Sequence, residues 1–100
     1  MPKSSTDRSL IRNATGVDGV MIRECLLRLA ASRSEGATYC PSEAARQLSG
    51  EWRPLMPRVR EVAAELVDEG LLVCTQKGEP ADPVAARGPI RLARAAAAAE

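Results

Sequence analysis

The chain has 100 residues, of which 45% are hydrophobic, and its 14 Lys or Arg side chains nearly balance 13 Asp or Glu side chains, giving a formal net charge of +1. This length predicts a single domain with a modest core. The small net charge excludes a strongly basic protein that coats nucleic acid non-specifically, so any cationic patch must be local.

The first 16 residues are mostly polar. They contain Lys3, Arg8 and Arg12 among Ser, Thr and Asn residues, and this composition predicts a flexible basic arm over residues 1–17. Such an arm either reaches into a minor groove of DNA or is simply solvated, and both interpretations stay open at this point.

A helical pattern runs from Asp18 to about Ser32. Asp18 is the expected N-cap, and Gly36 follows the end of the helix. The apolar stripe, which we expect to face the core, consists of Ile22, Cys25, Leu26 and Leu29.

The segment Ala37–Cys40 resembles a short strand, and Pro41 cuts it off. The following run, PSEAARQLSG, predicts a compact second helix with Ser42 as its N-cap and Gly50 as its stop. The connection from this helix to the next is short, as a helix-turn-helix requires.

The stretch from Trp52 to Gly70, WRPLMPRVREVAAELVDEG, predicts the third helix, around which the rest of the chain is organised. Pro57 suits a first helical position, so the helix is expected to begin there, with Pro54–Met56 as an entering turn. Gly70 is expected to end it. Its apolar stripe consists of Leu55, Val59, Val62, Ala63 and Leu66.

The C-terminal part predicts a hairpin. Leu71–Gln76 is rich in strand formers, Gly88–Leu92 alternates apolar and polar side chains, and the segment Lys77–Pro83 between them consists of turn residues. We expect the two strands to pair antiparallel, with Thr38–Cys40 as a candidate third strand. Residues 95–100 form an alanine-rich tail.

Together these elements predict a mainly α fold with a small β-hairpin wing. This is a winged helix-turn-helix domain of three helices and a two- or three-stranded antiparallel sheet, over residues 18–94. The expected core consists of Leu26, Leu29, Leu48, Val59, Val62, Leu66, Leu71, Ile90 and Leu92.

Four runs of the sequence are informative together: CPSEAARQL, EWRPLMPRVREVAAEL, EGLLVCTQKG and RGPIRL, within which the phrases WRPLMP, TQKG and RGPIR are unusual. They resemble the small bacterial family known as domain of unknown function 3253, over roughly residues 18–92. The resemblance implies a winged-helix fold. It carries no catalytic or ligand-binding residues onto this chain, because the family has no assigned activity.

In DNA-binding winged helices the third helix enters the major groove and the wing contacts the backbone. Here Glu65 and Asp68 would repel phosphates, so binding to double-stranded DNA has to use the N-terminal end of the helix. The predicted DNA-contacting residues are Arg53, Arg58, Arg60, Lys77, Arg87 and Arg91. The first three precede or occupy the start of the helix, with Arg58 and Arg60 nearest to the groove, and the others lie on the wing. A homodimer would supply useful specificity.

A protein-interaction module is the alternative, because winged helices also pair with proteins and the charge-mixed third helix suits a polar interface. Trp52 is interpreted as a plug that closes the turn between two helices, with base stacking as its alternative role. Arg53 and Arg58 have the alternative of pairing with nearby Glu residues for stability alone.

No enzyme and no cofactor are expected, since the chain has no histidine, no Gly-rich phosphate loop and no nucleophile–base pair. Cys25, Cys40 and Cys74 are interpreted as small core or interface residues, and a metal site built from their three thiolates is the alternative. With no signal peptide and no apolar run long enough to span a bilayer, we expect a cytoplasmic protein without membrane contact.

Overall fold

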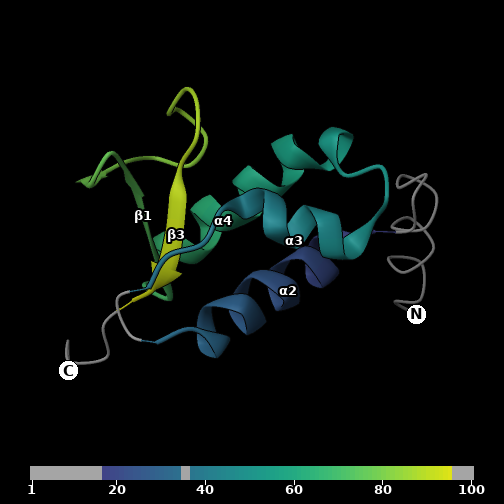
Figure 1. The fold of residues 1–100 in the computed structure, drawn as a ribbon, viewed down its shortest axis with the longest axis horizontal. Coiled ribbons are helices and arrows are strands. Elements are labelled where there is room, and N and C mark those ends of the chain that lie inside the picture. The colour runs from purple at the N-terminus through teal and green to yellow at the C-terminus, as the bar shows by residue number, and fades with distance from the viewer. Residues whose placement is uncertain (1–16, 35–36, 96–100) are drawn as a thin grey trace, which may run out of the picture.

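The computed structural model describes residues 17–34 and 37–95, which form three α-helices and a small sheet (Figure 1). The basic arm predicted before residue 17, Gly36 and the tail beyond residue 95 lie outside the described residues. Val17, which the sequence assigned to the arm, has 2% of its surface exposed and belongs to the core. The packed domain therefore includes at least one residue more than predicted.

Helix α2 (Gly19–Ser32) begins as the sequence predicts. The Oδ1 atom of Asp18 accepts a hydrogen bond from the Met21 amide at 3.0 Å, which satisfies one of the free amide groups of the first turn. The stripe Ile22, Cys25, Leu26 and Leu29 is buried, together with Ala30.

Helix α3 (Pro41–Leu48) starts two residues earlier than a cap at Ser42 would allow, because Cys40 is its N-cap. Pro41 has no amide hydrogen to satisfy and its φ angle is preset for a helix, so it is accommodated at the first helical position. Glu43 stabilises this end by accepting a hydrogen bond from the Cys40 amide at 3.4 Å. The helix ends at Leu48 with Ser49 as its C-cap, so Gly50 is the first residue beyond the cap, where the sequence predicted the stop.

The third helix is preceded by a 3₁₀ turn, η1 (Arg53–Leu55), and α4 spans Met56–Asp68. The predicted entering turn exists, but α4 begins at Met56 rather than at Pro57. Gly70 ends α4 with a φ of 82°, as expected, in a Schellman motif in which the Gly70 amide donates to Val67 and the Leu71 amide donates to Leu66.

The sheet contains β1 (Leu72–Gln76), β2 (Glu79–Pro80) and β3 (Arg91–Arg94), in the order β2-β1-β3 with antiparallel pairing throughout. The hairpin predicted from the sequence is confirmed, but its second strand is Arg91–Arg94 rather than Gly88–Leu92. The sequence analysis also missed β2. The candidate third strand at Thr38–Cys40 is reduced to one bridge, between Tyr39 and Leu92.

The cap of α4 sets which residues of β1 face the core. Because the Leu71 backbone completes the Schellman motif, the strand begins at Leu72, and Leu72 and Cys74 point inward. Leu71 is 41% exposed, so its predicted place in the core was wrong, and Leu48 is only partly buried. The other seven residues of the predicted core are buried.

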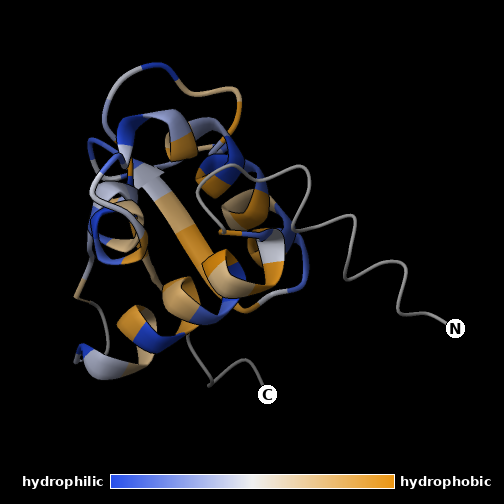
Figure 2. Ribbon diagram, turned by 90° about the vertical axis from the view of Figure 1, so that its right-hand side faces the viewer, coloured by the Kyte–Doolittle hydropathy of each residue, from blue (hydrophilic) through white to orange (hydrophobic). Residues whose placement is uncertain are grey.

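Tyr39 is a core residue that the sequence analysis did not identify. Its side chain is fully buried and its hydroxyl donates to the Leu26 carbonyl at 2.7 Å, while its backbone exchanges two 2.8 Å hydrogen bonds with Leu92. Tyr39 thus ties α2 to β3 across the centre of the domain. Figure 2 shows the apolar faces of the helices and a strand turned toward this shared interior.

Each of the three helices contacts the other two, and the sheet packs on them through contacts of β1 with α4 and of β3 with α2. Figure 1 shows the hairpin standing at one end of the helical bundle and the α3–α4 turn at the other. This is the α-rich, winged-helix-like arrangement that the sequence predicted.

Candidate nucleic-acid interface

The outer face of α4 changes charge along its length. Arg58, in the first turn, is exposed, and so are Glu61, Glu65 and Asp68 further along. Arg53 lies on η1, one turn before α4, and is also exposed. Only the N-terminal end of α4 is therefore suited to approach a phosphate backbone.

Arg60 does not point freely into solvent. Its guanidinium donates to the carbonyls of Pro83 at 3.3 Å, Ala86 at 2.8 Å and Gly88 at 2.5 Å. These carbonyls belong to the loop 81–90 between β2 and β3, which we call the wing loop. Arg60 thus holds the wing loop on α4, and its five N–H donors are largely occupied.

The wing loop is also ordered by its own hydrogen bonds. The Asp82 carboxylate accepts from the amides of Val84 at 2.8 Å and Ala85 at 3.1 Å, and the Ala86 amide donates to the Asp82 carbonyl at 2.9 Å. From β1, the Gln76 side-chain amide donates to the carbonyls of Arg87 and Pro89. The wing loop is therefore held from both sides, by Arg60 of α4 and by Gln76 of β1.

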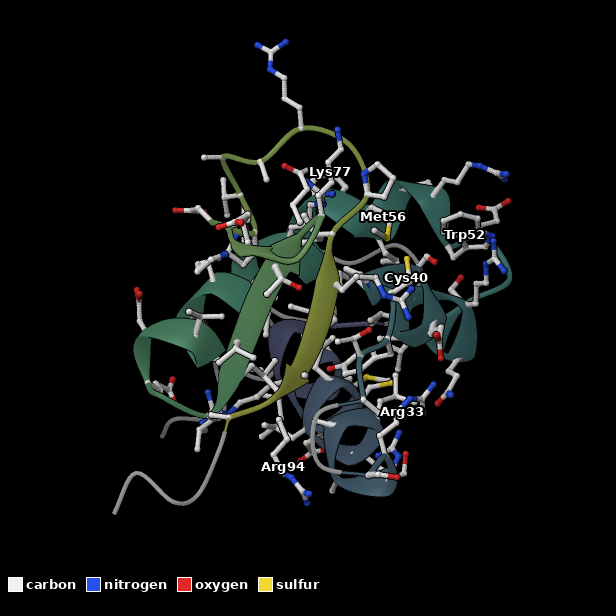
Figure 3. All side chains as sticks on the ribbon, turned by 60° about the vertical axis from the view of Figure 1, so that its left-hand side comes forward. Arg33, Cys40, Trp52, Met56, Lys77 and Arg94 are labelled. Carbon is white, nitrogen blue, oxygen red and sulfur yellow. The ribbon has the colours of Figure 1, made fainter. Side chains whose placement is uncertain are left out.

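Lys77 and Gly78 form a two-residue turn between β1 and β2. Both have positive φ angles, 56° and 83°, as a hairpin turn that matches the twist of its strands requires. The side chain of Lys77 is exposed. It lies at the opposite end of the sheet from Arg94, because Gln76 pairs with Glu79 whereas Leu72 pairs with Arg94 (Figure 3).

Arg58 points to the side of α4 away from the wing loop. Its Nη2 atom lies only 2.8 Å from the position that a Cβ atom on Gly19 would occupy, and its Nη1 atom pairs with Glu61 at 3.0 Å. A cleft of about 300 Å³ beside it is lined by residues of α2 and α4. Since residues two apart on a helix do not share a face, the structure separates Arg58 from Arg60.

Arg91 lies on β3 and reaches the segment before α3. Its Nε atom donates to the Thr38 hydroxyl at 3.0 Å and its Nη2 atom to the Thr38 carbonyl at 3.2 Å. The side chain is exposed, so these bonds position the guanidinium without burying it. Among the predicted site residues this leaves three that are exposed and form no side-chain hydrogen bond or ion pair with the described residues: Lys77 and Arg87 on the wing, and Arg53 before α4.

Arg46 was not among the predicted site residues, yet it shares a cluster with two residues that the sequence analysis discussed. The guanidinium carbons of Arg46 and Arg53 lie 4.5 and 4.6 Å from the centroid of the Trp52 ring. The ring is partly buried and packs against the core, which supports its predicted role as a plug. The sequence did contain a signal for Arg46. It lies in the last turn of one helix, shortly before an aromatic residue that precedes the next helix, and this spacing could have predicted the contact.

A protein-family model matches residues 20–95, and the family is described as "Protein of unknown function (DUF3253)". The chain belongs to this family. The resemblance seen in the sequence is thereby confirmed, and no curated protein matches the chain. Membership in the DUF3253 family assigns no activity, so evidence for a function comes from the surface of this domain.

The cysteines of this DUF3253 domain are all unpaired, and Cys25 and Cys74 are buried. Burial raises the pKa of both thiols, which disfavours the reactive thiolate. Over residues 17–34 and 37–95, no three His, Cys, Asp or Glu side chains gather closely enough to hold a metal ion. No helix in this part of the chain is long and apolar enough to cross a membrane.

Proposed function

We propose that this protein binds double-stranded DNA with the N-terminal end of α4 and the wing, in the manner of a small transcriptional regulator. The observation that supports this most is the attachment of the wing loop to α4 by Arg60. It joins the two parts of the surface and holds the loop that carries Arg87 in a fixed relation to Arg53 and α4, while Gln76 bonds the same loop to the end of β1 next to Lys77. None of these three cations forms an ion pair within the described residues.

The distribution of ion pairs supports the same surface. All three ion pairs of the described residues lie outside the sheet and the wing loop: Arg23–Glu69, Arg33–Glu43 and Arg58–Glu61. A protein cation that is already paired with a carboxylate displaces few of the counterions condensed on DNA, whereas an unpaired cation displaces them fully and so contributes fully to the binding free energy. The wing therefore offers the unpaired cations Lys77 and Arg87 to a phosphate backbone. A cytoplasmic location fits this role.

The test measures binding of a short random-sequence duplex by fluorescence anisotropy at about 50 and about 200 mM salt. The double variant Lys77→Ala, Arg87→Ala should reduce the slope of log affinity against log salt concentration by about two units. Arg94→Ala is the matched control for charge, because it removes a cation from the other end of the sheet and should leave the slope unchanged. Absence of saturable binding, or equal effects of Lys77→Ala and Arg94→Ala, would refute the proposal.

A protein-interaction module is the second candidate, and one feature favours it. A groove of about 680 Å³ between the start of α3, α4 and the wing loop is largely apolar. Its apolar lining includes Pro41, Met56, Ala86, Pro89 and Ile90. If the protein binds no duplex, a charge placed in this groove tests the second candidate. Ala86→Asp should then abolish any protein complex that the parent forms, because it puts a carboxylate on the apolar lining.

A further inference from the structure

The α3–α4 turn carries a second cluster of positive charge, separate from the wing. It contains Arg46 in the last turn of α3, Trp52 before η1, and Arg53 at the start of η1. Figure 3 shows Trp52 at the edge of the molecule, with Met56, the first residue of α4, between it and Lys77. The cluster and the wing therefore lie on either side of the N-terminal end of α4.

The two arginines of this cluster are exposed and keep their hydrogen-bonding capacity. Each guanidinium lies over the Trp52 ring, at 4.5 Å for Arg46 and 4.6 Å for Arg53. The ring attracts cations electrostatically and leaves their N–H donors unused. Within residues 17–34 and 37–95 neither side chain forms a hydrogen bond or an ion pair, and the neighbouring Glu51 is exposed and pairs with neither.

These features select the chemistry of the ligand. Two cations held near one ring repel each other, and anions that bind to them reduce the repulsion. A planar guanidinium with free donors matches the oxygen atoms of a phosphate group. The ring is an unsuitable platform for a nucleic-acid base, because the guanidinium groups already lie over it.

We propose that Arg46 and Arg53, held in place by Trp52, bind the backbone phosphates of duplex DNA on the side of α4 opposite to the wing. The inference rests on the proposed function and adds a second anchor to it. Phosphate contacts on both sides of α4 would fix its angle in the groove, which the wing alone does not do. The contacts themselves carry no sequence information.

The test uses Trp52 as its own probe, because it is the sole tryptophan of the chain. Random-sequence duplex carrying a fluorescent label is titrated into the full chain, and Trp52 emission is recorded together with the anisotropy of the label. We expect Trp52 emission to change with the same midpoint as the anisotropy. The double variant Arg46→Ala, Arg53→Ala should lower the salt slope by about 0.9 for each phosphate that it no longer neutralises.

Arg94→Ala is again the charge control, and the double variant Arg46→Lys, Arg53→Lys keeps the charges while it weakens the stacking on Trp52. The lysine variant should retain most of the salt slope and bind more weakly than the parent. If the parent binds duplex but Trp52 emission and the slope of the alanine variant do not change, this inference is wrong and the proposed function stands. If the parent binds no duplex, both fall.

Discussion

Replacing Arg60 by alanine tests whether the wing is attached to α4. The variant loses hydrogen bonds from a guanidinium to three carbonyls, two of which lie within 2.8 Å. A hydrogen bond to a charged group contributes about 1.5–3 kcal/mol when it is well shielded. Arg60 is half-buried and the carbonyls can turn to water, so we expect a total loss of about 1–3 kcal/mol in the free energy of unfolding.

For a domain of this size such a loss lowers the melting temperature by about 5–20 °C, which thermal unfolding followed by circular dichroism detects easily. The effect should also be local. Hydrogen exchange of the Val84, Ala85 and Ala86 amides should accelerate more than that of Leu92, whose amide bonds to Tyr39 in the sheet.

Arg58→Ala is the matched control, since Arg58 lies on the same helix and forms only an exposed ion pair with Glu61. Its removal should cost less than about 0.5 kcal/mol. The reasoning fails if Arg60→Ala is as stable as Arg58→Ala and the wing loop exchanges as in the parent. In DNA binding, Arg60→Ala should weaken the contacts of Arg87 by releasing the wing loop, rather than by removing a base contact.

Three further predictions concern the core. Leu72→Ala should destabilise the fold by about 2–5 kcal/mol in chemical unfolding, whereas Leu71→Ala should change it by less than about 0.5 kcal/mol; equal effects would show that the register of β1 is wrong. Tyr39→Phe should cost about 1 kcal/mol at neutral pH. Burial raises the pKa of Tyr39 above that in the unfolded chain, so the parent should lose stability as the pH rises above about 10. The Phe variant should lose less over the same range, where the buried thiols of Cys25 and Cys74 contribute equally to both proteins, as chemical unfolding curves at neutral pH and above about pH 10 would show. Cys40, which is half-buried, should react with a thiol reagent in the native state, and the other two cysteines only after unfolding, as peptide mapping of the labelled protein would show.

Local chemistry decided much of the fold, and the sequence therefore predicted it. Apolar periodicity placed α2 and α4, Asp18 capped α2, and Gly70 ended α4, because each of these depends on contacts within about four residues along the chain. Where two local signals competed, the observed position differs from the predicted one by one or two residues. Pro41 displaced the cap from Ser42, and the Schellman motif at Gly70 moved the inward face of β1 from Leu71 to Leu72.

Only the tertiary structure decided which cations act together. Arg58 and Arg60 are two residues apart in the sequence, but packing turns one toward α2 and the other onto the wing loop. The sequence places Tyr39 only in a short strand, and its burial depends on the hydrogen bond from its hydroxyl to the Leu26 carbonyl. These contacts join residues that are 13 to 39 positions apart. No periodicity or cap encodes them, because they exist only once the helices and the sheet have packed around a shared core.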